Sequence, residues 1–433
     1  MTMALARLRP RARGRTPHPA PLIDDESPSW PLTAVTTAGQ RASTLIARYL
    51  GAVGWWPGMI AYGGYGSTEE VRILGRALMT RSGDQRGWLA GRRGWRQFFD
   101  AQVPRQPVLV TCGRARAVAL ADNWGFLDLS LSGHGLAAGW HSAWIRPLHP
   151  DDVARSGIHE GDALRASRPP TGDAPRADPA TGAPSSPSAA RIRAGRATRV
   201  PVRIIGPDEK WGIVSDIDDT VMVSMVPRVL TAMRHALVDR VSTREAVPGM
   251  AGLLSSLARA AGTGRHEAPV VYLSTGAWNV APAVRDFLAR LDYPRGALLM
   301  TSFGPSNTGW FRSGLEHKRR ELRRLAAELP DIQWILIGDD GQRDPQVYAE
   351  FAREHPGHVA GIAIRSLSQL QQVMSHGTLA PLVPDALWSV PEDIPVWYGI
   401  DGSSLMASMR QGGLDRRLHP RSVAAGREGP ARQ

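Results

Sequence analysis

Short apolar runs alternate with amphipathic helical patterns between residues 208 and about 375, and this alternation restricts the fold more than any other feature. It predicts a parallel, doubly wound α/β sheet. Ligands of such sheets bind at the carboxyl ends of the strands, so the residues that follow each run are the candidates for function. Asn279 and Ser313 are the expected caps of two helices. The expected strands are 211–215, 269–273, 334–337 and 359–364, and the expected helices are 228–240, 249–261, 279–291, 314–329 and 345–354.

An acid-rich segment, Asp216-Ile217-Asp218-Asp219-Thr220, follows the first of these strands. Side chains alternate along a strand, so Asp216 and Asp218 point the same way. One carboxylate can attack a phosphorus atom, its neighbour can transfer protons, and both can help to hold Mg²⁺. Acid pairs at strand ends also bind Ca²⁺ or cap the next helix, so this segment alone leaves those interpretations open.

Three more polar groups follow later elements in order. Ser274-Thr275-Gly276 follows the second strand, a basic helical segment carries Lys318, and Asp339-Asp340 follow the third strand with Asp344 shortly after. The lysine is informative because Lys and Arg together number 52, and Lys210 is the only other lysine. A site that needs a compact ammonium keeps Lys, since the planar Arg fork is not equivalent. An exposed helix cation is the alternative interpretation of Lys318.

This series of acid pair, hydroxyl, lysine and acid pair resembles the haloacid dehalogenase superfamily of aspartate-nucleophile phosphatases. Over roughly residues 208–370 the chain is also similar to the catalytic domain of the phosphatidate phosphatases first known from fungal actin patches, as a bacterial relative of that family. The segments that carry the second resemblance are 215–221, 247–250, 272–274, Trp278-Asn279, His317-Lys318, 336–339, Gly341-Gln342, Asp344-Pro345, Val347-Tyr348 and 362–365.

The resemblance implies a role for each site residue. Asp216 would be the nucleophile that forms an aspartyl-phosphate, and Asp218 would protonate the leaving oxygen and then activate water. Lys318 would neutralise the nucleophile and the transferring phosphoryl group. Thr220 would brace the loop and contact substrate, with a plain helix cap as the alternative.

A phosphate-binding loop is expected after the second strand. Ser274 would donate a hydrogen bond to a phosphoryl oxygen, and Thr275 is the competing residue for this task. The fungal-type pattern is Ser-Asn-Ser-Pro-Trp, whereas this chain has Ser274-Thr275-Gly276-Ala277-Trp278. Thr275 and Gly276 are therefore expected to contact substrate in a loop that departs from the family pattern.

The expected metal ion is Mg²⁺, because hard oxygen ligands beside a phosphoryl group favour it over zinc. The resemblance implies that an Asp216 oxygen and the Asp218 backbone carbonyl bind the ion and that Asp339 completes its shell. Asp344 would orient a metal-bound water or the lysine. Asp340 replaces the usual Ser of the family, and is either a second metal ligand or a solvated loop acid.

The rest of the chain divides by composition. Residues 1–35 are Pro-rich and basic and are expected to be disordered, and 36–206 contain short strands between turns, which predicts a smaller, sandwich-like all-β domain. Residues 166–190 form a flexible Pro/Ala/Ser loop within it. Residues 207–375 form the phosphatase domain, and 376–433 form an extension with a basic tail. The expected β-domain strands are 71–74, 107–111, 117–120, 125–129, 140–145 and 199–205.

Some smaller features of this first half also carry expectations. The glycine-rich segment 62–67 lacks the Lys-Ser/Thr pair of a Walker loop and is interpreted as a turn. Trp55 and Trp56 are expected to pack in a core, with a membrane interface as the alternative. The apolar segment 49–62 is short of the roughly 20 residues that a spanning helix needs. The lone Cys112 excludes disulfides within the chain and fits a reducing compartment.

Charge sets the partners that can be expected. The formal net charge is +12, and arginines concentrate at both ends of the chain. Such runs have three interpretations. They are solvated tails, or they attract anionic membrane surfaces, or they bind nucleic acid without specificity. No nucleic-acid motif is present, so no specific nucleic-acid partner is expected.

These features favour a Mg²⁺-dependent phosphatase that converts phosphatidate to diacylglycerol, in the cytoplasm and peripheral on the membrane. A small helical cap over 221–248 would leave the site open to a lipid headgroup. The same chemistry on a soluble phosphomonoester or a phosphoprotein is an alternative. A non-catalytic, phosphatidate-sensing module is another, which the presence of both Asp216 and Asp218 argues against. The sequence does not give the oligomeric state.

Overall fold

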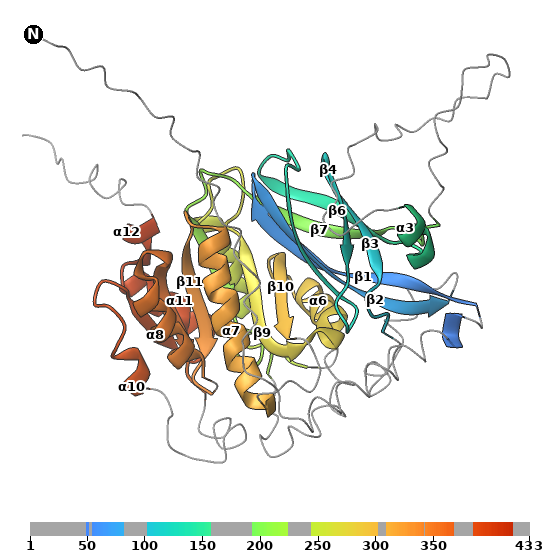
Figure 1. Cartoon of the computed structure of the whole chain (residues 1–433). Coiled ribbons are helices and arrows are strands. Elements are labelled where there is room, and N and C mark those ends of the chain that lie inside the picture. Colours follow the sequence, from blue (N-terminus) through green and yellow to red (C-terminus); the bar gives the residue numbers. More distant parts are fainter. Residues whose placement is uncertain are drawn as a thin grey trace, which may run out of the picture.

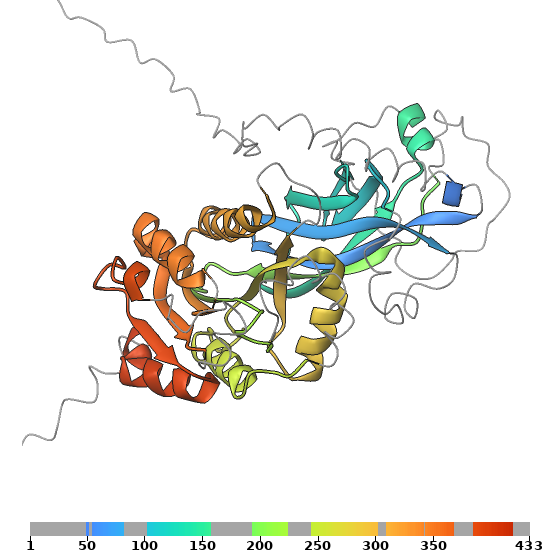
Figure 2. The ribbon, with the colours of Figure 1, turned by 90° about the horizontal axis from the view of Figure 1, so that it is seen from below.

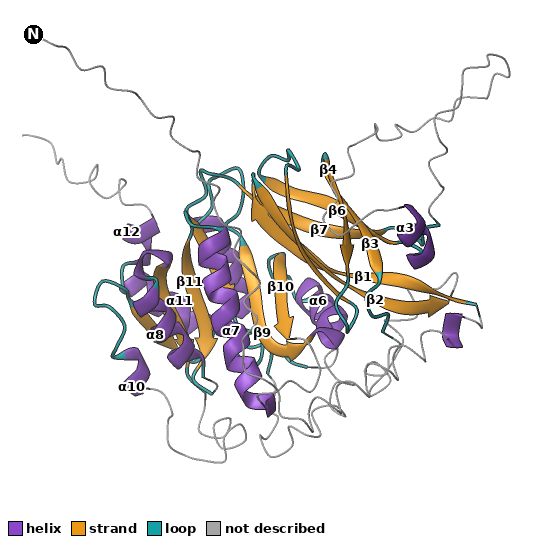
Figure 3. Cartoon of the chain, in the orientation of Figure 1, coloured by secondary structure: helices purple, strands orange, loops and turns teal. Residues whose placement is uncertain are grey.

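Two sheets lie side by side in this protein (Figure 1; Figure 3). The computed structural model describes residues 49–51, 54–81, 102–156, 193–223, 244–301, 309–341, 343–367 and 384–418. The expected helix at 228–240, most of the cap, the loop at 166–190 and both terminal tails lie outside these residues.

The first sheet has six strands and is parallel throughout, with the order β10-β9-β8-β11-β12-β13. The four strands predicted from apolar runs are confirmed. The acid-rich segment therefore leaves a strand in the interior of the sheet. The bounds are β8 (Trp211–Ser215), β9 (Val270–Ala277), β10 (Gly296–Thr301), β11 (Gln333–Asp339), β12 (Val359–Arg365) and β13 (Val396–Gly399).

Helices lie on both sides of this sheet (Figure 2). On one side α7 and α8 contact each other, and on the other α5 contacts α11. The four described helices predicted from periodicity are confirmed as elements. The bounds are α5 (Met250–Ala260), α6 (Ala281–Arg290), α7 (Gly309–Glu328), α8 (Asp344–Glu354) and α11 (Gly402–Gln411), with short helices α3 (Pro150–Ser156), η4 (Trp278–Val280), η5 (Pro356–His358), α10 (Pro384–Leu387) and α12 (Leu414–Leu418).

The parallel sheet continues past residue 375, where the sequence analysis ended the phosphatase domain. Strand β13 pairs with β12, and Trp397 packs so closely on Gly361 that a Cβ there would lie 2.3 Å from the indole. Leu405 and Met409 of α11 are fully buried in the same core. Strand β13 could not be predicted from its residues, because four residues are too few to show a period.

The second sheet has seven strands in the order β4-β3-β6-β7-β1-β2-β5, and its end strands β4 and β5 contact each other. It is thus one nearly closed sheet, where a sandwich-like arrangement was predicted. All pairs are antiparallel except β1 with β7. The bounds are β1 (Trp55–Ser67), β2 (Glu70–Arg81), β3 (Pro107–Cys112), β4 (Ala115–Leu120), β5 (Phe126–Ser132), β6 (Gly139–Pro147) and β7 (Thr198–Ile205).

The prediction of a turn at 62–67 is wrong, because these glycines belong to β1. A Cβ on Gly64 would lie 2.4 Å from the carbonyl oxygen of Arg72 on the paired strand β2. Gly63 has a φ of 101° at the point where the β1–β2 register shifts. Glycine here serves close strand pairing and a bulge rather than a loop.

The two sheets share one hydrophobic core. Tyr62, Tyr65, Leu74 and Phe126 from the seven-stranded sheet belong to the same buried cluster as the interior of the parallel sheet. A second, smaller cluster fills the inside of the closed sheet and includes the buried Cys112. Trp56 is 49% exposed, so its predicted core packing is wrong. No helix among the described residues has the length and apolar character needed to cross a membrane.

Candidate active site

Three carboxylates meet at the carboxyl edge of the parallel sheet. Asp216 directly follows β8, Asp339 ends β11, and Asp344 begins α8. The Asp216 amide donates to the Ile337 carbonyl at 2.9 Å, which fixes the two strand ends relative to each other. One oxygen from each of the three acids lies within 4.8 Å of the others. The sheet topology therefore brings Asp216 to two acids that lie more than 120 residues later in the sequence.

A glycine allows the third acid to approach. A Cβ on Gly338 would lie 2.5 Å from the Asp344 Oδ2 atom and 2.8 Å from the Tyr348 ring. Any larger residue at this position of β11 would push α8 away from the sheet. The glycine before Asp339 thus sets the distance between Asp339 and Asp344.

Lys318 of α7 reaches into this group of acids. Its Nζ donates to the Asp216 Oδ1 atom at 2.7 Å and also to Asp344, and all three side chains are buried. Burial alone would lower the pKa of Lys318, but Asp216 and Asp344 raise it above its ordinary value. The lysine is therefore a charged group of the site and not the exposed helix cation that the sequence left open.

The site carries more negative charge than Lys318 balances. Burial and the neighbouring Asp344 and Asp218 raise the pKa of Asp216 to about 8, although Lys318 opposes this rise. Burial, Asp344 and Asp216 likewise raise the pKa of Asp339 well above its usual value. Among the described residues, one oxygen each of Asp216, Asp339 and Asp344 is buried with no hydrogen-bond partner. Buried carboxylate oxygens without hydrogen-bond partners are suitable ligands for a divalent cation such as Mg²⁺.

Asp218 lies beside these acids and is not in the three-acid group. Its Oδ2 atom accepts a hydrogen bond from Ser274 Oγ at 3.2 Å, and its Oδ1 atom is 3.5 Å from an Arg244 nitrogen. The Gly276 amide donates to Ser274 Oγ at 2.9 Å, so the start of the expected phosphate loop is ordered around that hydroxyl. Ser274 is thus the hydroxyl that faces the acids.

Thr275 is held by its backbone, since Thr301 Oγ1 donates to the carbonyls of Thr275 and Gly276 at 3.0 and 3.1 Å. The Thr220 hydroxyl donates to the Asp339 Oδ2 atom at 3.5 Å, a long contact between the acid-rich loop and β11. The predicted substrate contacts of Thr220, Thr275 and Gly276 stay predictions.

Asp340 makes a structural contact. Its Oδ1 atom accepts a hydrogen bond from the Leu367 amide at 2.8 Å, and its own amide donates to the Arg365 carbonyl at 3.0 Å. The carboxylate is buried, so the interpretation as a solvated loop acid is wrong. Its role as a metal ligand stays a prediction, because the group of three converging acids does not include it.

Sequence reasoning missed two arginines of the site. Arg244 lies against Asp218, and Arg365, at the end of β12, donates to the Asp219 carbonyl at 2.6 Å and the Ile400 carbonyl at 3.0 Å. Asp219 has a left-handed φ of 59°, so the acid-rich loop turns sharply at the residue that Arg365 holds. Arg365 could have been found from its position at the end of a strand beside β11. Arg244 could not, because nothing in the sequence distinguishes it from the many other arginines.

Comparison with known proteins gives one family match. Residues 211–366 match the family model described as the catalytic domain of the phosphatidate phosphatase APP1. An uncharacterised protein of Schizosaccharomyces pombe is 28% identical over 159 residues, which are 36% of this chain and 25% of that protein. The chain therefore spans about a quarter of that relative's length.

Similarity to solved structures is low. A carbohydrate acetylesterase from Xanthomonas citri aligns over 74% of this chain and 73% of its own at 10% identity, with a TM-score of 0.23. A β-glucuronidase from Parabacteroides merdae aligns over 72% of this chain and 34% of its own at 9% identity, with a TM-score of 0.19. Neither value supports a common fold.

Proposed function

We propose that this chain is a Mg²⁺-dependent phosphatase that releases phosphate from phosphatidate through an aspartyl-phosphate on Asp216. The observation that carries the proposal is the convergence of Asp216, Lys318, Asp339 and Asp344, with three unpartnered carboxylate oxygens, inside the region that matches the phosphatidate phosphatase model. The six-stranded unit would then be a doubly wound domain of the haloacid dehalogenase type.

In the first half-reaction Asp216 attacks the phosphorus atom and the bond to the glycerol oxygen breaks. Asp218 lies on the same loop and would give its proton to that leaving oxygen. The Ser274 hydroxyl, which donates to Asp218 in this structure, would donate to a phosphoryl oxygen when substrate is bound. Lys318 balances the charge of the nucleophile throughout.

In the second half-reaction Asp218 takes a proton from water, and the water oxygen attacks phosphorus. The acyl-phosphate bond breaks, inorganic phosphate leaves, and Asp216 is regenerated as a carboxylate. Asp216 and Asp339 would hold Mg²⁺, with Asp344 beside them. When bound, the ion would stabilise negative charge on the phosphoryl oxygens.

One experiment distinguishes a lipid substrate from a soluble one. Phosphate release is measured from phosphatidate in mixed micelles and from a soluble phosphomonoester, each with and without Mg²⁺. The parent protein is compared with Asp216→Asn, which keeps the size of the side chain and removes the nucleophile. Lipid turnover that disappears in the variant and without metal supports the proposal.

The remaining outcomes contradict it in different ways. Turnover of the soluble ester alone would keep the chemistry and reject the lipid. Absence of turnover on both substrates, with retained binding to phosphatidate vesicles, would instead favour a non-catalytic module.

A further inference from the structure

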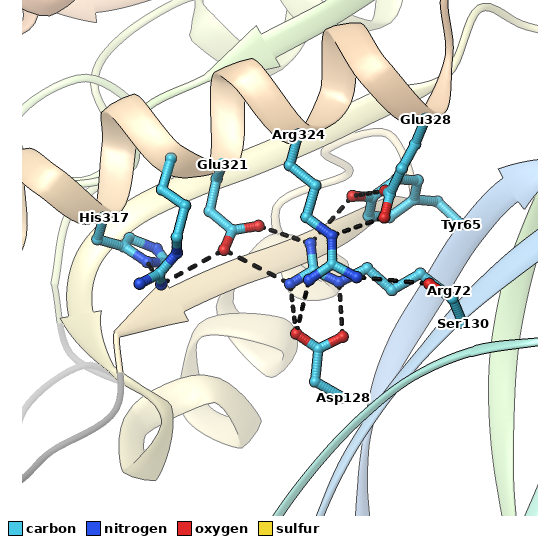
Figure 4. A network of polar contacts seen from close by, with 9 residues as sticks. Tyr65, Arg72, Asp128, Ser130, His317, Glu321, Arg324 and Glu328 are labelled. Carbon is cyan, nitrogen blue, oxygen red and sulfur yellow. Dashed lines mark hydrogen bonds and ion pairs between the residues drawn. The ribbon is translucent and has the colours of Figure 1, made fainter. Parts of the chain in front are cut away.

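A network of charged side chains, with Arg72 and Glu321 buried within it, joins α7 to the seven-stranded sheet (Figure 4). Arg72 of β2 donates to Glu321 at 2.6 Å, and their side chains are 5% and 4% exposed. Arg72 also makes two hydrogen bonds to Asp128 of β5, at 2.8 and 2.7 Å. The guanidinium therefore links two strands of the sheet to one point on the helix.

The same helix face makes further contacts with that sheet. Tyr65 of β1 donates to Glu328 at 2.7 Å, and Arg324 donates to Asp128 at 2.9 Å. Glu321, Arg324 and Glu328 follow helical spacing, so they share one face of α7. Lys318 lies less than one turn before Glu321, on the neighbouring face that looks into the acids. A shift of α7 along the sheet would move Lys318 by the same amount.

A second contact fixes the chain that follows Ser274. Arg76 of β2 donates to the Asn279 Oδ1 atom at 2.6 Å and lies 4.3 Å above the Phe126 ring. The Tyr62 ring of β1 stacks on Trp278 with centroids 4.4 Å apart. Trp278 and Asn279 come directly after the loop that Ser274 begins, so the seven-stranded sheet also holds the far end of that loop.

Another buried ion pair of the seven-stranded sheet does not involve α7 and serves as a comparison for Arg72–Glu321. Arg203 of β7 pairs with Glu209, and their side chains are 6% and 1% exposed. This pair joins the seven-stranded sheet to the chain just before β8, at the edge of the parallel sheet away from the acids. The Arg203–Glu209 pair matches the Arg72–Glu321 pair in residue types and burial. Glu321 is close to Lys318 in the chain, whereas Arg203 and Glu209 are far from it.

We propose that the seven-stranded sheet positions the catalytic groups: Arg72 sets the place of Lys318 through Glu321, and Arg76 sets the place of the Ser274 loop through Asn279. Both arginines are positioning residues, since among the described residues neither contacts Asp216, Asp339 or Asp344. The inference rests on the proposed function and adds a role for the seven-stranded sheet, which lies outside the residues 211–366 that the family model matches. Misplacing a catalytic group by about 1 Å costs on the order of a hundredfold in rate.

The first test measures kcat and KM on a soluble phosphomonoester for Arg72→Met, Glu321→Gln and the double variant. Arg203→Met is the matched control, because it also breaks one buried ion pair of the same sheet. We expect Arg72→Met to lower kcat about 10- to 100-fold with little change in KM, and Arg203→Met to leave kcat within about twofold. Glu321→Gln keeps an oxygen acceptor for Arg72 and should retain most of the activity.

The second test reports the position of Lys318 by NMR and needs no activity measurement. Lys210 and Lys318 are the only lysines, so protein made with lysine labelled by ¹³C at Cε gives two side-chain NMR signals. We expect Arg72→Met to shift the signal of the buried Lys318 and leave that of Lys210. Arg203→Met should do the reverse, because Lys210 is next to Glu209. Lys210→Arg assigns the signals.

These readouts separate failure of the positioning role from failure of the proposed function. Equal kcat losses in Arg72→Met and Arg203→Met, or an unmoved Lys318 signal in Arg72→Met, would overturn the positioning role of Arg72. A parent protein without activity would reject the proposed function, and the NMR signals would still decide whether Arg72 places Lys318. If Arg72→Met does not fold, Arg72→Lys takes its place, since one ammonium cannot serve both Asp128 and Glu321.

The Arg76 contact has its own pair of variants. Asn279→Asp keeps the oxygen that Arg76 needs, whereas Asn279→Leu removes it at similar size. We expect Asn279→Asp to retain kcat and Asn279→Leu to lower it about tenfold, with no further loss when Arg76→Met is added. Unchanged kcat in Asn279→Leu, or additive losses in the double variant, would overturn this part of the proposal.

Discussion

Lys318 shows how a single residue type can report on chemistry in an Arg-rich chain. Its ammonium lies between Asp216 and Asp344 and donates to both carboxylates within the buried site. We expect Lys318→Arg to keep the fold, because the charge remains, and to lower kcat at least about a hundredfold, because the guanidinium displaces the acids. Steady-state kinetics with Tm measurement tests this, and Lys210→Arg is the control. A Lys318→Arg variant as active as the parent would show that only the charge matters.

His317 makes the stability of the fold depend on pH. Burial lowers its pKa to about 4, although the nearby Glu321 opposes this effect. The folded state keeps the imidazole neutral, while the unfolded state takes up a proton below about pH 6.5. The contribution to stability is therefore complete above pH 6.5 and is lost as pH falls towards 4.

Urea unfolding at pH 7.5 and pH 5 measures this effect. We expect the parent to lose about 1–2 kcal/mol more than His317→Gln between these values, since a shift of one pKa unit is worth about 1.4 kcal/mol. His355→Gln, in which a partly exposed histidine on the same side of the sheet is replaced, is the control. An identical pH dependence in the parent and His317→Gln would contradict the assignment.

The sequence predicted the site residues that follow strands and missed those that depend on distant packing. Asp216 and Asp339 were predictable because parallel strands bring their carboxyl ends to one edge. Glu321 was not, because its partner Arg72 is 249 residues away in the chain and nothing local marks the pair. Asn279 was predicted as a helix cap, but Val280 occupies that position of α6 and Asn279 accepts from Arg76 instead.

At the scale of elements, the end of β12 holds the loop that leaves β8. Arg365 donates to the Asp219 carbonyl at the left-handed turn and to the Ile400 carbonyl after β13. We expect Arg365→Met to lower kcat by about tenfold or more, because the Asp219 carbonyl loses its donor and the loop relaxes. The lost hydrogen bond should also lower the free energy of unfolding by about 1–3 kcal/mol.

Kinetics and urea unfolding of the same preparations test this element. Arg417→Met is the control, because Arg417 also donates to the Ala360 carbonyl of β12, but at the other end of the strand. A loss of stability in Arg365→Met with unchanged kcat would mean that the loop keeps its geometry without the arginine.

The accuracy of the predicted element boundaries depended on how clear the local sequence pattern was. Ser313 lies inside α7, which begins at Gly309, so the predicted cap is wrong. Strand β10 was also missed, because its apolar run follows a helix after only a short polar turn. Helix α8 was predicted within one residue at each end, since its buried face is fixed by many side chains together.

At the scale of the whole molecule, the two sheets should unfold together. Opening the interface between them would expose the shared apolar core. It would also leave the buried charges of Arg72, Arg76 and Glu321 without their partners. We expect hydrogen exchange of β7 and β8 peptides to give the same free energy of opening, measured by mass spectrometry in increasing urea. Earlier opening of β7 would show that the seven-stranded sheet is a separate folding unit, as the sequence-based domain boundary near residue 206 implies.

The parallel pairing of β1 with β7 has a consequence for biosynthesis. Gly64 pairs with Val202, so the two partners are about 140 residues apart in the chain. At roughly 5–20 residues per second, a ribosome needs about 10–30 s to deliver the second partner after the first. During that interval the nascent β1–β2 hairpin has an open backbone edge. A chaperone that covers exposed strand edges would therefore act on this protein early, before any part of the six-stranded sheet has been made.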